Sequence, residues 1–147
     1  MPGGNCWQAT ENIFRMKKKL RIFSLVLLLL LGSSAIGGGW MLINDPSGFS
    51  MQLPIVLLSQ TPFDNYLVPG IILLVAVGFL SIVVGILTIR SSTNYTLWLI
   101  LMGCILFIWL TTEVMLNIEF YHPLYHLPLY TISLILIIIG ILQRKLA

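Results

Sequence analysis

Four apolar runs limit what this sequence can fold into. They lie at about residues 22–43, 68–89, 95–117 and 123–142, and the third of them contains a single acid, Glu113. A helix rises about 1.5 Å per residue and the hydrocarbon core of a bilayer is about 30 Å thick, so one span needs roughly 20 apolar residues. The chain is 58% hydrophobic and 9% charged, whereas soluble domains have about 25% charged residues. We therefore expect an all-α membrane protein with four transmembrane helices.

The basic residues predict the orientation of these spans, because short loops rich in Lys and Arg stay on the cytoplasmic side of a membrane. All eight lie before the first run, between the second and third, or after the fourth: Arg15, Lys17, Lys18, Lys19, Arg21, Arg90, Arg144 and Lys145. Segments 44–67 and 118–126 contain none. The pattern predicts an antiparallel four-helix bundle in the plasma membrane, with both termini cytoplasmic.

The same pattern divides the chain into three parts. We expect a cytoplasmic basic tail at 1–21, a membrane domain at 22–143 with an outer loop at 44–67, and a cytoplasmic end at 144–147. The net charge of +3 then reports membrane orientation and attraction to anionic lipid. It does not indicate nucleic-acid binding, because no folded soluble domain presents the basic residues.

The N-terminal region permits a second interpretation. From Met16, the sequence MKKKLRIFSLVLLLLLGSSA has the basic start, apolar core and small residues, Ser33 and Ala35, of a secretory signal peptide. Its cleavage would leave three spans. The apolar run continues through IGGGWMLI to a full membrane thickness, which favours an uncleaved anchor. We expect the residues before Met16 to be a disordered cytoplasmic end or the product of a misassigned start.

Small residues at positions i and i+4 are typical of contact faces between helices in lipid, where association depends on close packing. The first two runs contain several of them: Ser33, Ser34, Ala35, Gly37, Gly38, Gly39, Gly78, Ser81 and Gly85. Gly103 and Gly140 are single small residues in the third and fourth runs. We predict that these residues pack the helices together. The alternative is a substrate or ion path lined by GSSAIGGG.

The outer loop is unusually apolar. DPSG at 45–48 matches a type I turn, and TPFDNYLVPG at 61–70 supplies a second turn in which Asp64 or Asn65 can cap the next helix. LPIVLL at 53–58 is too short to cross a membrane, and Pro54 argues against a central strand. We expect a short extracytoplasmic helix from about Pro54 that lies in the interface or covers the mouth of the bundle.

Polar side chains gather near the outer ends of the spans. They comprise four of the five acids and both histidines: Asp45, Asp64, Glu113, Glu119, His122 and His126. An ionisable group inside a span costs about 2.5 to 3.5 kcal/mol at mid-membrane and usually faces the bundle interior with a partner. Trp109, Glu113 and Asn117 share one helix face. We predict a ligand or proton site formed by these residues in an outward cavity. The alternative is a Glu113 that only snorkels or accepts a hydrogen bond from a hydroxyl group.

Evidence for metal or cofactor chemistry is weak in this sequence. His122 and His126 have the i, i+4 spacing of paired metal ligands, but no HExxH pattern or cysteine accompanies them, and Pro123 opposes a helix that includes His122. Histidines that bond loop carbonyls or sense pH are the favoured interpretation. Cys6 and Cys104 form no CxxC pair, and there is no phosphate loop, dinucleotide motif or nucleophile elbow. We predict no metal, no cofactor and no catalytic residue.

Two stretches, DPSG...LP...L...TPFDNYLVPGIILL and the HPLY before the last apolar run, resemble small four-helix bacterial membrane proteins of the DoxX-like group. The resemblance covers about residues 22–143. It implies a helix bundle in a bacterial inner membrane and an accessory role in membrane redox systems linked to quinone or thiol stress. No catalytic motif of that group can be placed on residues of this chain.

Three functions agree with these features. The first is a non-enzymatic inner-membrane protein whose outer mouth, formed by 44–67 and 113–126, binds a small lipophilic ligand or a partner protein. The second is an accessory subunit of a redox complex, with Glu113 and the histidines near quinone. The third is a small transporter that uses Glu113 for proton coupling. The expected partners are membrane lipid, with another membrane protein or quinone as further candidates.

Overall fold

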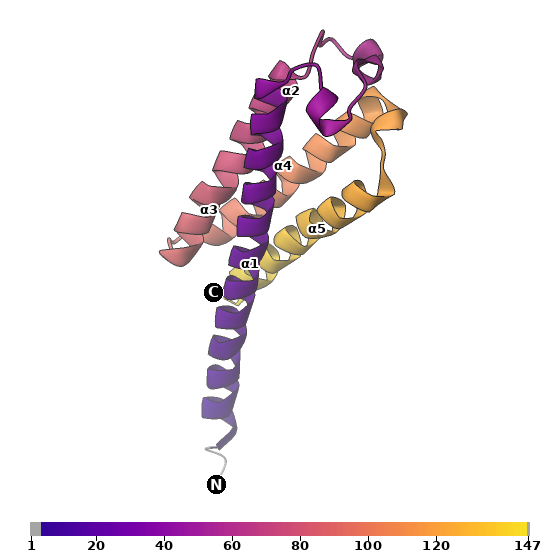
Figure 1. The fold of residues 1–147 in the computed structure, drawn as a ribbon. Coiled ribbons are helices and arrows are strands. Elements are labelled where there is room, and N and C mark those ends of the chain that lie inside the picture. Colours follow the sequence, from indigo (N-terminus) through magenta and orange to yellow (C-terminus); the bar gives the residue numbers. More distant parts are fainter. Residues whose placement is uncertain (1–3, 147) are drawn as a thin grey trace.

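The computed structural model describes residues 4–146, and they form helices joined by short loops, with no strand in that range (Figure 1). The long elements are α1 (Gly4–Asn44), α2 (Leu67–Ile72), the π-helical segment η3 (Leu73–Phe79), α3 (Leu80–Ile89), α4 (Tyr95–Leu116) and α5 (Pro123–Lys145). α2, η3 and α3 follow one another without a break. Three short 3₁₀ helices lie in the loops: η1 (Phe49–Met51), η2 (Ile55–Gln60) and η4 (Ile118–Phe120).

Within residues 4–146, four helices are long and apolar enough to cross a membrane. They are Trp7–Asn44, Leu67–Ile89, Tyr95–Leu116 and Pro123–Lys145, with mean hydropathies between 2.0 and 2.9. The prediction of four helices of membrane-spanning length and hydropathy is therefore confirmed. The last helix begins at Pro123, because proline is tolerated in a first turn, where its missing N–H has no intrahelical partner. Pro128 lies inside this helix without ending it.

α1 begins much earlier than the first apolar run. Residues 4–14, which we expected to be disordered, are helical, and residues 1–3 lie outside the described range. The physical reason is local, since neither glycine nor proline interrupts the chain from Asn5 to Leu31. Glu11 and Arg15 also form an ion pair of 2.7 Å one helical turn apart. Figure 1 shows this part of α1 extending beyond the ends of α3 and α5.

Two pairs of helices build the core. α1 packs along α2, η3 and α3, and α4 packs along most of α5. The side chains between them are almost fully buried: Leu28, Val84, Leu99, Met102, Leu106 and Leu136. Gly103 and Gly140 allow the close approach of α4 and α5. A Cβ atom on Gly103 would lie 2.6 Å from Ile137, and one on Gly140 would lie 2.6 Å from Ile100.

Only some of the small residues of the first two runs lie at helix contacts. A Cβ atom on Gly39 would lie 2.8 Å from the Gly70 carbonyl oxygen, and one on Gly78 would lie 2.7 Å from the Ile36 side chain. A Cβ atom on Gly38 would lie 3.6 Å from the Leu73 side chain, an ordinary van der Waals contact. Ser81 is buried, and its hydroxyl donates to the Val77 carbonyl.

Four of the predicted packing residues lie elsewhere. Gly37 and Gly85 have open space where a Cβ atom would be, and Ser33 and Ser34 are exposed. Consecutive helical residues point about 100° apart, so Gly37 faces away from the contact that Gly39 makes. The spacing pattern also missed Gly32 and Gly70, whose added Cβ atoms would lie 3.2 Å from Ser81 and 2.7 Å from Leu42.

Alanine substitutions separate these two environments. Gly39→Ala places a methyl group against the Gly70 carbonyl, so we expect a loss of about 1 to 3 kcal/mol of stability from overpacking. Gly37→Ala adds a methyl group in open space, and we expect it to be neutral or to stabilise α1 by up to about 1 kcal/mol through higher helix propensity. Thermal unfolding in mild detergent, followed by circular dichroism, measures both. Equal melting temperatures for the two variants would contradict this packing.

Candidate functional site

Two segments distant in sequence meet at one end of the bundle. This end, called the loop end below, carries residues 45–66 and 117–122 (Figure 1). The Asn117 amide nitrogen donates to the Leu57 carbonyl oxygen at 3.0 Å, and its amide oxygen accepts from the Glu119 N–H at 2.9 Å. Asn117 is buried, and its extended backbone ends α4. Its side chain therefore joins the two segments, a role that its sequence spacing did not predict.

Tyr66 holds the 45–66 segment from inside. Its ring is 2% exposed and packs with Leu42 and Leu58, and its hydroxyl donates to the Pro54 carbonyl at 2.9 Å. Its backbone N–H donates to the Pro46 carbonyl at 2.9 Å. Burial raises the pKa of Tyr66, because a phenolate ion loses hydration in an apolar surrounding. Tyr66 thus supports the loop and keeps its proton.

Asp45 organises the turn that leaves α1. The Gly48 N–H donates to the Asp45 carbonyl at 3.1 Å, as a type I turn requires, and Gly48 has a φ of 77° that favours glycine. The Asp45 carboxylate accepts hydrogen bonds from the hydroxyl and N–H groups of Ser47 and Ser50. These bonds, the Ser47 hydroxyl first, lower the pKa of Asp45 to about 2. Asp45 is thereby committed to the turn.

An apolar cavity of about 780 Å³ lies beneath this loop. LPIVLL forms much of its cover, because Leu53, Leu57 and Leu58 line the cavity while Ile55 and Val56 are exposed on the other side. Leu42, Tyr66 and Leu73 close one side, and α4 and α5 form the other. The loop that the sequence marked as unusually apolar is therefore one wall of a cavity.

A carboxylate and an imidazole face each other in this cavity. The Nε2 atom of His126 lies 3.8 Å from the Oε2 atom of Glu113, which is longer than a hydrogen bond. His126 is 8% exposed, and its Nδ1 atom lies 3.2 Å from the backbone nitrogen and oxygen of His122. Its Nε2 atom makes no hydrogen bond with any residue that the structure describes. Trp109 lies one helical turn from Glu113 on α4 and lines the same cavity.

The predicted site residues separate into two groups. Trp109, Glu113, Glu119, His122 and His126 line the cavity, and Asn117 fixes its wall. Asp45 and Asp64 do not line it. The reason is that Asp45 is held by its own turn and Asp64 is exposed on the loop.

The two histidine rings pack on different tyrosines. The His122 ring packs on Tyr125 at a centroid distance of 5.2 Å, and the His126 ring packs on Tyr121 at 5.6 Å. Within residues 4–146, no group of three or more His, Cys, Asp or Glu side chains is arranged to hold a metal ion.

Comparison with family models, curated proteins and solved structures gives no match to this chain. The DoxX-like resemblance therefore stays a hypothesis.

The hydrogen bonds to the Asp45 carboxylate make the stability of this turn depend on pH. Because its pKa is lowered from 3.8 to about 2, its stabilisation of the turn is fully present above pH 4 and is lost as the pH falls toward 2. Ser47→Ala removes the strongest of these hydrogen bonds, so we expect the titration midpoint of Asp45 to move up toward 3.8.

Carboxyl-carbon NMR of aspartate-labelled protein in detergent measures this midpoint. Ser59→Ala is the matched control, because Ser59 is exposed on the same loop and is not among the groups that shift Asp45. A midpoint that is the same in wild type and Ser47→Ala would contradict the assigned hydrogen bonds.

Proposed function

We propose that this protein is an integral inner-membrane protein that holds one small lipophilic molecule in the loop-end cavity. In this proposal its four spans run antiparallel, its termini are cytoplasmic and the loop end faces the opposite side. The four apolar helices support the membrane location. The distribution of Lys and Arg supports the orientation, because the loop-end segments carry none of these residues.

One observation carries the proposal: an apolar cavity that contains a facing Glu113 and His126. Its volume of about 780 Å³ falls within the roughly 300 to 1,000 Å³ of typical small-molecule sites, which are mostly apolar with a few polar groups that orient the ligand. Water alone is a poor occupant of so large an apolar space. The lining therefore favours a molecule with a long apolar body and a small polar head.

The positions of Glu113 and His126 limit which chemical group the polar head of the ligand can carry. Two atoms 3.8 Å apart can each bond one oxygen atom placed about 2.8 Å from both. A hydroxyl group meets both needs, because it accepts from an imidazole N–H while it donates to a carboxylate oxygen. An ether or a carbonyl group accepts from His126 but leaves Glu113 without a donor. We infer that a hydroxyl-bearing lipophile is the preferred ligand class.

The cover of the cavity fits a position in the outer membrane interface. Phe49, Ile55 and Val56 are 86%, 52% and 62% exposed, and all three lie on the cover rather than on a span. In the proposed arrangement these side chains enter the headgroup region while η1 and η2 lie parallel to the membrane. A lipophile could then enter the cavity from the bilayer without crossing water.

Two probes that differ in whether the head oxygen carries a hydrogen atom or a methyl group test the ligand class. We expect 1-dodecanol to bind the purified full chain at a 1:1 ratio, and 1-dodecyl methyl ether to bind at least five-fold more weakly. Glu113→Leu and His126→Phe should each weaken dodecanol binding about ten-fold or more, since hydrogen bonds to charged groups contribute about 1.5 to 3 kcal/mol. Native mass spectrometry from mild detergent measures the bound fraction.

Thr112→Val is the matched control for these variants. Thr112 lines the same cavity, but its hydroxyl donates to the Ile108 carbonyl of its own helix. We expect this variant to bind dodecanol as the wild type does. Equal binding of alcohol and ether, or an unchanged affinity in Glu113→Leu, would contradict the proposed site.

The same preparation separates the other two functions that the sequence suggests. Trp109, Phe63 and Tyr125 give the cavity an aromatic lining, which suits the planar head of a quinone. Tighter binding of decylubiquinone than of dodecanol, together with co-purification of other membrane chains, would favour the accessory redox role. Concentrative uptake by reconstituted vesicles, lost in Glu113→Gln, would favour the transporter.

Cysteine labelling tests the proposed orientation. In a background that lacks Cys6 and Cys104, Asp64→Cys and Thr93→Cys place one exposed thiol at each end of the bundle. We expect a membrane-impermeant maleimide to label Asp64→Cys in intact spheroplasts and to label Thr93→Cys only after lysis. The reverse pattern, or labelling of both before lysis, would overturn the proposed topology.

A further inference from the structure

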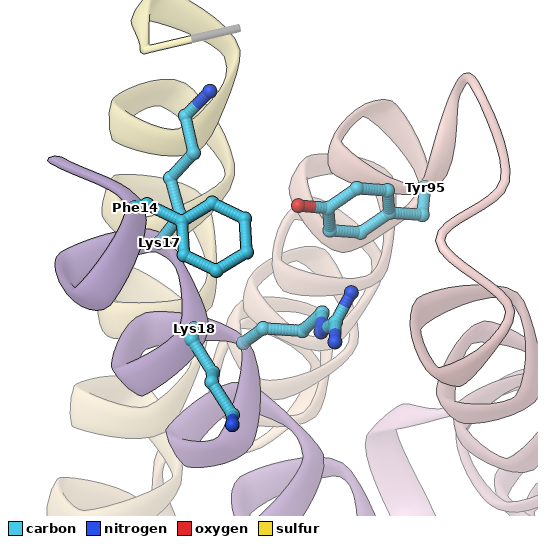
Figure 2. Close-up of a pocket in the computed structure, with 5 residues that line it drawn as sticks. Phe14, Lys17, Lys18 and Tyr95 are labelled. Atoms are coloured by element: carbon cyan, nitrogen blue, oxygen red, sulfur yellow. The ribbon is translucent and has the colours of Figure 1, made fainter. Parts of the chain in front are cut away.

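A second cavity lies at the opposite end of the bundle and has a different chemistry. It has a volume of about 310 Å³ and is lined by Phe14, Lys17, Lys18 and Arg21 of α1 and by Tyr95 of α4. We call it the basic cleft. Figure 2 shows Lys17 and Lys18 extending to different sides of α1, with the Tyr95 hydroxyl directed toward that helix. Three basic side chains therefore line one small space.

These cations have no carboxylate partners within the described residues. Of the five acids in the chain, Glu11 pairs with Arg15, which does not line the cleft. The other four acids belong to the loop-end segments and the adjacent turn of α4. The Arg21 guanidinium donates to the Ser91 hydroxyl, a neutral partner that positions the arginine. Within residues 4–146, no carboxylate pairs with the three basic side chains of the cleft, which favours an anionic occupant.

The position of the cleft along α1 indicates where that occupant comes from. The apolar run of α1 begins at Ile22, directly after Arg21, so the cleft lies at the level where a lipid headgroup meets the acyl region. Beyond it, Ile22, Phe23 and Val26 are about half exposed and offer α1 an apolar surface that acyl chains can cover. A soluble anion makes no use of that surface.

We propose that the basic cleft binds the phosphate group of an anionic phospholipid. Lys17, Lys18 and Arg21 supply the positive charge, and the Tyr95 hydroxyl supplies a neutral donor to a phosphate oxygen. Phe14, which is 70% exposed, packs against the headgroup at the rim. This binding requires the membrane location but is independent of any ligand in the loop-end cavity. Its effect is to fix α1, through Arg21 and Ser91, against the α3–α4 connection.

Short-chain lipids test the site on the full-length protein in a neutral maltoside detergent. Native mass spectrometry follows titrations with dioctanoyl phosphatidylglycerol, dioctanoyl phosphatidylcholine and sn-glycerol 3-phosphate. We expect the phosphatidylglycerol to bind at least ten-fold more tightly than either of the other two. Lys17→Gln and Lys18→Gln should each weaken it about five-fold, as expected for one basic residue near an anionic membrane surface.

Lys19→Gln is the matched control, because it removes the same charge from the adjacent position of α1 without touching the cleft. We expect the affinity of Lys19→Gln for the phosphatidylglycerol to change less than two-fold. An equal loss in Lys19→Gln would mean diffuse attraction and would overturn the site. Equal binding of the phosphatidylcholine, or glycerol phosphate binding as tight as the phosphatidylglycerol, would overturn the anionic lipid as occupant. Unchanged helical circular dichroism in each variant verifies that the change in binding is not caused by unfolding.

Discussion

The hydrogen bond from Asn117 to the Leu57 carbonyl is the contact on which the loop end depends. It joins the 45–66 segment to the end of α4, and so determines where LPIVLL lies. Non-helical backbone near a membrane is tolerated where its polar groups are bonded within the protein. The Asn117 side chain donates to the Leu57 carbonyl, and the Tyr66 hydroxyl donates to the Pro54 carbonyl. With these two bonds made, the apolar side of the loop covers a cavity instead of an open helix face.

The two ends of the bundle have opposite electrostatic character. Glu113, His126 and Glu119 line the loop-end cavity, whereas lysine and arginine surround the basic cleft. The bundle between them is held by close packing at a few glycines, among them Gly39 and Gly103. This close-packed apolar core lies between the loop-end cavity and the basic cleft, which share no lining residue.

Sequence reasoning predicted the parts of the fold that depend on local pattern. The four spans, the start of α5 at Pro123 and the turn at Asp45 all follow from hydropathy or from residue type at one position. The shared face of Trp109 and Glu113 also follows from helical spacing, and both residues line the cavity.

The parts that depend on contacts between distant segments were not predictable. Asn117 and Tyr66 gave no sequence signal for their partners, which lie 60 and 12 residues away. Asp45 was predicted as a site residue because it was expected near the outer ends of the spans with the other acids, but its carboxylate is hydrogen-bonded within its own turn. Gly37 matched the small-residue spacing and still faces open space, because spacing alone does not say which helix face is covered.

Fluorescence from Trp109 tests most directly whether the loop-end cavity holds a lipophilic alcohol. The measurement uses a variant in which Trp109 is the sole tryptophan, after substitution by phenylalanine of Trp7, Trp40 and Trp98. We expect 11-bromoundecanol to quench Trp109 with saturation at one molecule per chain, because Trp109 lines the cavity. A variant that keeps Trp98 alone, which does not line the cavity, should show only weak, unsaturated quenching. Unsaturated quenching of equal slope in both variants would contradict the account.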